Sequence, residues 1–176
     1  MDSSIIFSNL NVLKFVVMQE GLLTPAIATT VTRLTSHVLD MPLRARDLDL
    51  DEWLAKPNPA KWSKLEILGH LVDSAINNLK RFTDVQYLPQ PYRITPYQQD
   101  DLVTINAYQQ LPFDHILQMW IGLNQQILYV IANLPADKLS HQVIIPNGEV
   151  KTLGWWIDDY ADHMEHHLRQ IFYPKT

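Results

Sequence analysis

Apolar residues recur at steps of three and four in four long segments of the chain, the spacing that places side chains on one face of an α-helix. The first segment follows Pro25, the second follows Ser63, the third begins near residues 112–114 and the last follows Thr152. Pro42 is expected to end the first helix, because a proline inside a helix removes a backbone hydrogen bond. The pattern therefore predicts four long helices.

The second predicted helix combines a well-defined start with an unusual polar stripe. Ser63 and Glu66 form an S-x-x-E capping box, in which each residue bonds the backbone N–H of the other. Beyond it, polar residues recur at helical spacing between apolar flanks: His70, Asp73, Ser74, Asn77 and Arg81. Such a stripe faces either solvent or a polar pocket, and this helix alone leaves both interpretations open.

The last predicted helix carries histidines inside an apolar pattern. One seam at steps of three and four contains Leu153, Trp156, Tyr160, His163, His167 and Gln170. An i, i+4 histidine pair can hold one metal ion from a single helix face, although histidines in helices are more often hydrogen-bonded core or rim residues. His166 is rotated off the seam and suits the rim. The zincin pattern is disfavoured, because Met164 follows His163 and Glu165 comes one residue later.

The connections complete the predicted architecture. Residues 83–101 carry three tyrosines and three prolines, which suits a rigid crossover, and a helix from about Asp101 to Gln110 is expected to follow. The sequence around Asn147-Gly148 is typical of a hairpin. The prediction is an all-α four-helix bundle, with a long crossover between its second and third helices and a short hairpin-like insert before the fourth. Residues 22–174 form one domain, and residues 1–21 are expected to be an extension outside the fold.

Composition narrows the classes of partner and chemistry. The net charge is −5 and no run of Lys or Arg occurs, so nucleic acid is not an expected partner. No apolar run approaches the length needed to span a bilayer and no signal peptide is present, which predicts a cytoplasmic protein without membrane contact. The 176 residues include no cysteine, so a metal must be held by His and oxygen ligands, and any thiol must come from outside.

Three stretches together resemble the DinB/YfiT-like superfamily of metal-binding four-helix bundles: KWSKLEILGHLVDSAINNLKRF, PYQQDD and HMEHHLRQIF. The resemblance extends over roughly residues 22–172. It rests on a W-S-x-x-E-x-x-x-H-L pattern and on an H-x-x-x-H pattern followed by Gln, present here as Trp62, Ser63, Glu66, His70 and Leu71, then His163, His167 and Gln170. One departure is the YQQD sequence of residues 97–100, where many relatives have YDQD.

The resemblance implies that His70, His163 and His167 coordinate one divalent metal ion, with zinc or nickel expected first. Three neutral imidazoles leave open positions on such an ion, which is typical of a reactive site. If His70 faces the ion, Ser74, Asn77 and Arg81 are expected to line the same cavity. Arg81 is then expected to bind a carboxylate of a thiol cofactor or substrate.

Asp73 and Asp159 each lie one turn from a candidate metal ligand and are candidates to orient an imidazole; solvated carboxylates are the alternative. Members of the superfamily include thiol S-transferases and metal-dependent hydrolases. The resemblance therefore implies an enzyme that acts on a small molecule, and a homodimer by analogy. Transfer from a low-molecular-weight thiol is the first hypothesis and hydrolysis of a small amide or ester is the second. A non-catalytic metal-binding or interaction module is the third.

Overall fold

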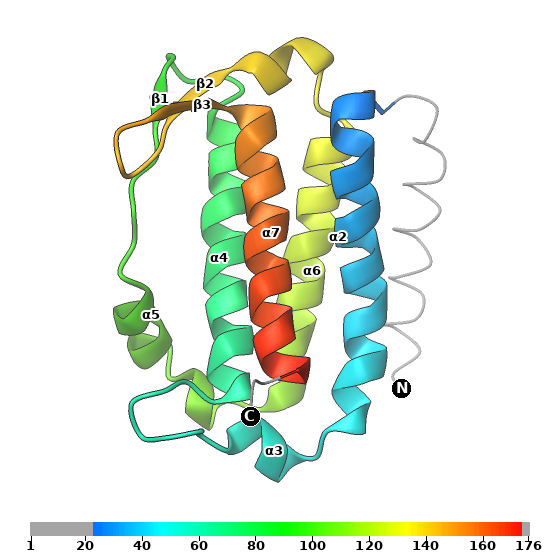
Figure 1. Cartoon of the computed structure of the whole chain (residues 1–176), viewed down its shortest axis with the longest axis vertical. Coiled ribbons are helices and arrows are strands. Elements are labelled where there is room, and N and C mark those ends of the chain that lie inside the picture. Colours follow the sequence, from blue (N-terminus) through cyan, green and yellow to red (C-terminus); the bar gives the residue numbers. More distant parts are fainter. Residues whose placement is uncertain (1–22, 174–176) are drawn as a thin grey trace.

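A computed structural model of the chain describes residues 23–173, and the predicted extension at residues 1–21 lies outside them. Four long helices lie side by side along the length of the molecule (Figure 1): α2 (Pro25–Arg44), α4 (Lys64–Asp84), α6 (Phe113–Ala132) and α7 (Leu153–Phe172). Each of them packs mainly against two others, so the order around the bundle is α2, α6, α4, α7. The prediction of an all-α four-helix bundle is confirmed, and α4 and α7 are neighbours.

Local sequence accounts for most of the helix ends. At the start of α4 the Ser63 hydroxyl accepts a hydrogen bond from the Glu66 N–H, and the Glu66 carboxylate accepts one from the Ser63 N–H, as the capping box predicted. Thr152 caps α7 through the Trp155 N–H. The prediction for Pro42 was wrong, since α2 continues to Arg44. A proline in the last turn of a helix is tolerated because little helix remains to be disrupted.

The core fills the space between the four helices. Its fully buried side chains include Val31, Leu34, Leu68, Val72, Trp120, Ile127, Ile157 and Met164. Removing each such side chain from water contributes about 1.5–3 kcal/mol. Behind α4, the ring of Tyr108 packs directly on the backbone of Gly69, where an added Cβ would lie 2.1 Å from the ring carbon Cγ. Only glycine allows this approach, so Gly69 fixes how closely the crossover packs against α4.

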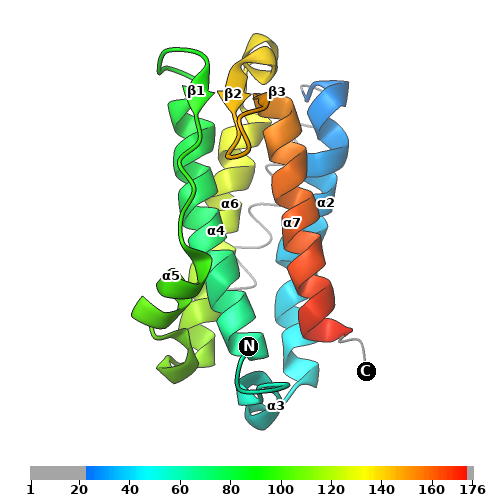
Figure 2. The same cartoon turned by 60° about the vertical axis from the view of Figure 1, so that its left-hand side comes forward.

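The crossover between α4 and α6 is more ordered than its sequence predicted. It contains β1 (Tyr92–Arg93), α5 (Gln99–Ile105) and the 3₁₀ turn η2 (Tyr108–Gln110), so the helix is shorter than expected and begins earlier. Figure 2 shows the chain descending along α4 from β1 to α5. The buried Asp84 carboxylate anchors its start, because it accepts hydrogen bonds from the hydroxyls of Tyr87 and Tyr92.

The predicted hairpin is present as β2 (Gln142–Ile144) and β3 (Val150–Thr152). Gly148 takes a φ of +90° in its turn, a conformation that favours glycine. β1 pairs parallel with β2, with Tyr92 opposite Val143. This pairing was not predicted, because the two segments are far apart in sequence. Shorter elements complete the fold: η1 (Ala45–Asp47), α3 (Leu50–Leu54) and η3 (Ala136–Ser140).

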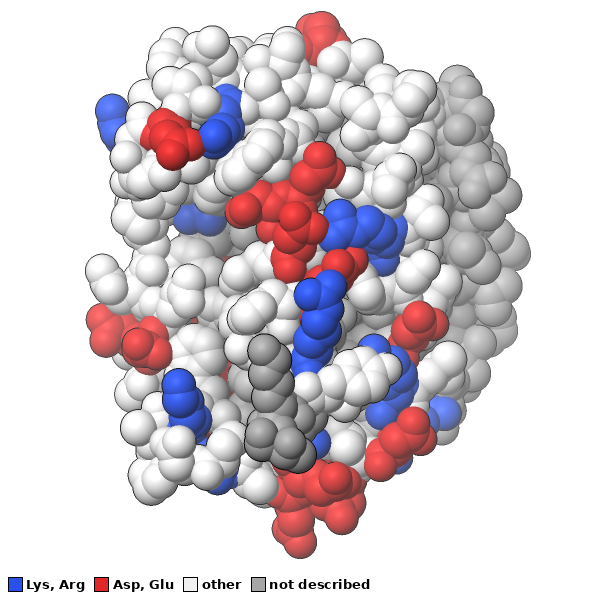
Figure 3. Space-filling model, viewed as in Figure 1, with Lys and Arg blue, Asp and Glu red and all other residues white. Residues whose placement is uncertain are grey.

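Ion pairs join α2 to α7 on the outer surface of the bundle. Arg33 contacts Asp162 at 2.5 Å and Glu165 at 2.8 Å, and His37 approaches Glu165 at 3.1 Å. Figure 3 shows the acidic side chains over α7 with basic side chains beside them. These contacts hold the outer face of α7 while its other side meets α4. No helix within residues 23–173 has the length and apolar character required to cross a membrane.

Candidate metal centre

Three histidines from two helices meet between the N-terminal half of α4 and the C-terminal half of α7. The His70 ring lies 5.1 Å from the His163 ring and 4.6 Å from the His167 ring, measured between centroids. The Nε2 atoms of His70 and His163 are 3.2 Å apart. Two nitrogens bound tetrahedrally to one zinc ion, each about 2.0–2.1 Å from it, lie about 3.3 Å apart. The spacing of these donors therefore fits a single divalent ion.

Burial keeps this cluster neutral. The His70 side chain is fully buried, and its pKa is lowered from 6.5 to about 3, chiefly by desolvation and then by the neighbouring histidines. The pKa of His163 is lowered to about 4 and that of His167 is also lowered, again with burial as the largest cause. All three imidazoles are neutral near pH 7, the form that metal coordination requires.

Neighbouring polar groups orient two of the rings. The Gln170 side-chain oxygen lies 2.8 Å from Nδ1 of His167 and accepts a hydrogen bond from its N–H, so Nε2 of that ring carries the free lone pair. The Ser74 hydroxyl lies 3.5 Å from Nδ1 of His163. Nδ1 of His70 is buried without a hydrogen-bond partner among the described residues. The lone pair of His167 Nε2 is thus available to a metal ion, and one buried ring nitrogen, Nδ1 of His70, lacks a hydrogen bond among the described residues.

The histidines flank the buried face of α7. That face contains Leu153, Ile157, Tyr160, Ala161, Met164, Leu168 and Ile171, whereas His163 and His167 are partly exposed at its edge toward α4. The predicted seam therefore lies on the border of the core. His166 is exposed and contacts the Gln170 side chain at 3.1 Å, which agrees with its predicted rim position.

A cavity of about 210 Å³ adjoins the histidine cluster at His163. Residues from α4, the crossover, the hairpin and α7 line it: Ser74, Asn78, Arg81, Ile94, Pro96, Tyr97, Gln99, Pro146, Trp156, Asp159, Tyr160 and His163. Its wall combines aromatic and proline rings with one cation and one carboxylate. A small molecule in this cavity would lie directly beside His163.

Only some residues of the polar stripe on α4 line the cavity. Ser74 and Arg81 line the cavity, whereas Asn77 is not among its lining residues and donates a hydrogen bond to the Asp73 backbone carbonyl. Asn78 lines it instead and accepts a hydrogen bond from the Trp156 indole N–H at 2.8 Å. Asn78 was not predicted as a cavity residue, although it lies four residues after Ser74 and three before Arg81 and so shares the helical spacing of the stripe.

The two aspartates proposed to orient imidazoles have other surroundings. Asp73 accepts hydrogen bonds from the Tyr108 hydroxyl at 2.7 Å and the Asn106 amide at 2.8 Å, which ties the crossover to α4. Asp159 lines the cavity, and its pKa is raised by burial and by Asp162. Neither carboxylate forms a hydrogen bond with a histidine in the part of the chain that the structure describes.

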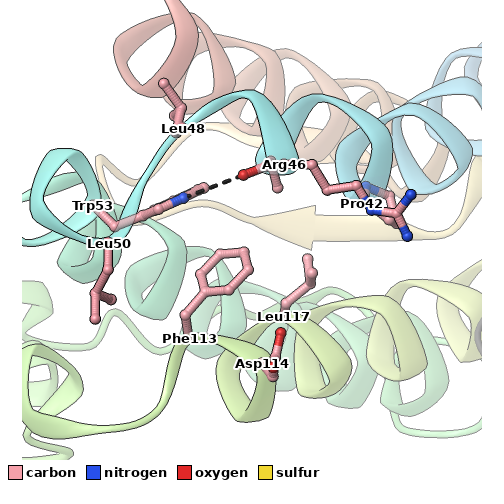
Figure 4. Close-up of a pocket in the computed structure, with 9 residues that line it drawn as sticks. Pro42, Arg46, Leu48, Leu50, Trp53, Phe113, Asp114 and Leu117 are labelled. Atoms are coloured by element: carbon pink, nitrogen blue, oxygen red, sulfur yellow. Dashed lines mark hydrogen bonds between the residues drawn. The ribbon is translucent and has the colours of Figure 1, made fainter. Parts of the chain in front are cut away.

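A second cavity, of about 230 Å³, lies at the other side of the bundle between α2, α3 and α6 (Figure 4). Most of its lining is apolar, with Leu48, Trp53, Phe113 and Leu117 among the residues that form it. The Trp53 ring packs 4.6 Å from the Phe113 ring, and its N–H points to the Ala45 carbonyl at 3.4 Å. This cavity contains no histidine.

Comparison with known proteins agrees with this geometry. The family model of the DinB superfamily matches residues 34–171. The chain belongs to the DinB superfamily. The fold is also similar to that of YfiT from Bacillus subtilis, described as "a probable metal-dependent hydrolase with an unusual four-helix bundle topology", with a TM-score of 0.75 over 85% of this chain and 86% of that one. The two sequences are 16% identical, so the likeness shows the fold alone. No curated protein matches the chain.

Proposed function

We propose that this DinB-superfamily protein is a metal-dependent enzyme acting on a small molecule, with His70, His163 and His167 as ligands of one divalent ion. The observation that carries the proposal is that one ring nitrogen from each of the three neutral imidazoles lies within 4.8 Å of the other two. His163 also lines the adjoining cavity. Zinc or nickel suits such a nitrogen donor set. Among the described residues the buried Nδ1 of His70 has no hydrogen-bond partner, and an unsatisfied buried nitrogen is costly.

Transfer from a low-molecular-weight thiol is the first proposed activity. A bound ion would favour the thiolate form of an incoming thiol and so supply the nucleophile. In the transfer, the sulfur forms a bond to an electrophilic carbon of the substrate, and the leaving group departs with its electron pair. The chain contains no cysteine, so the thiol is a co-substrate rather than a side chain.

The residues around the cavity have roles in binding and proton movement. Gln170 and Ser74 orient the rings of His167 and His163, and Trp156 and Tyr97 contribute aromatic surface to the cavity wall. Asp159 is the carboxylate that lines the cavity, and its raised pKa brings it nearer the range in which a carboxyl group accepts and returns protons. We assign Asp159 the role of accepting the proton that the thiol or the water molecule loses.

Hydrolysis of a small amide or ester is the second proposed activity, with a specific observation in its favour. A carboxylate beside the metal centre suits general-base activation of water, and Asp159 occupies that position. The fold neighbour YfiT is itself described as a probable metal-dependent hydrolase. The two activities share one centre and differ in the nucleophile.

Metal content is the decisive test. We expect elemental analysis of protein purified without a metal-affinity tag to find about one ion per chain, and almost none in His70→Ala or His163→Ala, because two imidazoles hold an ion far more weakly than three. His166→Ala is the matched control, since this exposed residue lies next to His167 but outside the cluster. Retention of the ion in all of these variants would overturn the ligand assignment.

Turnover assays then separate the activities. Metal-loaded protein is incubated with electrophiles and an added thiol, and separately with small esters and amides in water. S-transfer predicts product only when the thiol is present, and hydrolysis predicts product without it. Asp159→Asn is expected to lower either rate about 10²-fold or more while leaving the metal in place. Stoichiometric metal without turnover in either assay would favour the third hypothesis, a non-catalytic module.

A further inference from the structure

Arg81 is a buried cation without an anionic partner. Its side chain is only 8% exposed, yet no carboxylate among the described residues lies within ion-pair distance of it. The guanidinium donates to two neutral acceptors, the Thr95 carbonyl at 2.6 Å and the Asn78 side-chain oxygen at 3.4 Å. A guanidinium has five N–H donors, so much of its bonding capacity is unused.

The surroundings of Arg81 favour an incoming anion. Its pKa is lowered, with burial as the largest cause, which shows that its charge is poorly solvated. The rings of Tyr97 and Trp156 lie on it, each with its centroid 5.6 Å from the guanidinium carbon. These rings hold the group in position without neutralising it. A buried charge is costly unless it is paired, and all three residues line the cavity beside His163.

A continuous row of polar side chains on α4 connects Arg81 to His163. Asn78, which the guanidinium contacts, donates to the Ser74 hydroxyl at 3.3 Å, and that hydroxyl lies 3.5 Å from the His163 ring. Asn78 and Ser74 are one helical turn apart, and Arg81 and Ser74 are two. Seven residues of α-helix rise by about 10 Å, so the guanidinium and the His163 ring are on the order of 10 Å apart along the cavity.

The charges of the cavity favour a monoanion. Among the described residues that line it, Arg81 is the one cationic side chain, no lysine is present, and Asp159 contributes a negative charge. A phosphate dianion is commonly bound by several donors and cations, and Asp159 would repel it. A carboxylate matches the planar fork of one guanidinium through two parallel hydrogen bonds.

We propose that the small molecule bound beside His163 carries a carboxylate that pairs with Arg81, on the order of 10 Å from the His163 ring. The proposal rests on the proposed function in one respect, that this cavity is the substrate or co-substrate site. It narrows the ligand class to elongated small acids, such as a thiol or an ester with a distant carboxylate.

Calorimetric binding of matched acids and amides tests the proposal. The probes are ω-mercaptoalkanoates from 3-mercaptopropanoate to 8-mercaptooctanoate and their primary amides, titrated into the zinc-loaded protein. Sulfur is common to both series, so the acid-to-amide ratio reports the carboxylate alone. We expect the acids to bind about 10- to 100-fold more tightly, with the largest ratio at intermediate chain length. Equal affinities, or a ratio independent of chain length, would overturn the proposal.

Variants connect the preference to Arg81. Arg81→Gln should reduce the acid-to-amide ratio to near one, and Arg81→Lys should retain part of it because the charge remains. Arg93→Gln is the matched control, since Arg93 is exposed on β1 and does not line the cavity. Circular dichroism checks that each variant is folded. A ratio unchanged in Arg81→Gln would refute the assignment.

The outcomes also separate this inference from the proposed function. Stoichiometric metal and turnover without an acid preference would overturn the carboxylate site alone. An Arg81-dependent acid preference in a protein that takes up no metal would overturn the metal-dependent activity and support the carboxylate site. The two ideas can therefore fail independently.

Discussion

The two cavities of this bundle are similar in volume but differ in the chemistry of their walls. The cavity between α2, α3 and α6 is lined mostly by apolar side chains around Trp53. The cavity between α4, α7 and the crossover is lined by His163, Asp159 and Arg81, and the buried Arg81 donates to neutral acceptors without an anionic partner among the described residues. Volume alone would not distinguish them. We propose from this difference that an unpaired buried charge, rather than space, marks the functional site.

The same contrast separates stability from function within one small domain. Around Trp53, side chains contribute through burial and close packing, and a loss there is expected to weaken the whole fold. Around His70, burial makes the charged form of the imidazoles unfavourable and keeps them in the neutral form that metal coordination requires. Substitutions and acid should therefore affect the two regions differently.

The largest expected effect is the loss of stability on replacing Trp53 with Ala. The side chain is 1% exposed, and its removal leaves a void beside Phe113. We expect the free energy of unfolding to fall by about 3–5 kcal/mol in urea titrations, with metal content unchanged. Leu50→Ala is the control in the same cavity, and a small effect is expected because Leu50 is 58% exposed. Loss of metal with little loss of stability would break the distinction between the regions.

Acid should destabilise the metal-free protein through the histidine cluster. Above pH 6.5 these histidines are neutral in both folded and unfolded chains, so they contribute no pH dependence. Below 6.5 the unfolded chain binds protons that the folded cluster excludes, because the folded pKa values are about 3 for His70 and about 4 for His163. The free energy of unfolding therefore decreases as the pH is lowered, by at most about 1.4 kcal/mol per pH unit for each histidine.

Thermal unfolding with a chelator between pH 7.5 and 4.5 measures this effect. The range lies above the ordinary pKa of 4.5 for a glutamate, so the lowered pKa of Glu165 contributes little there. His70→Phe should flatten the slope by removing one excluded proton. A slope that is the same in this variant would show that His70 is not held neutral by folding.

A smaller effect is expected at Gly69, which lies next to His70 on α4. In an open helical position, Gly→Ala stabilises a protein by up to about 1 kcal/mol. Here the new Cβ would lie 2.1 Å from the Tyr108 ring, so we expect destabilisation by about 1–3 kcal/mol. Gly122→Ala on α6 is the matched control, because no atom of residues 23–173 lies within 4 Å of its added Cβ. Equal effects of the two changes in urea titrations would show that Tyr108 moves aside without cost.

Sequence patterns predicted the helices and their starts well because those features depend on residues within one or two turns. The capping box at Ser63 and the cap at Thr152 are local hydrogen bonds, and both are present. The continuation of α2 past Pro42 was missed, since the cost of a proline depends on its distance from the helix end. The parallel pairing of Tyr92 with Val143 was missed because no local signal specifies a partner 51 positions away.

By itself the sequence determined the helical bundle, the shared helix face of His163 and His167, and the absence of a cysteine ligand or nucleophile. The i, i+4 spacing alone requires the first of these histidines to lie near the second. The family resemblance predicted that His70 joins that pair, and the tertiary structure brings the three rings together. Only the tertiary structure decided that Asn78 rather than Asn77 lines the cavity, and that Arg81 lacks an anionic partner among the described residues. These facts depend on how α4 is rotated against α7 and on where the crossover lies. Both are set by packing between segments distant in sequence, which no periodicity within one segment encodes.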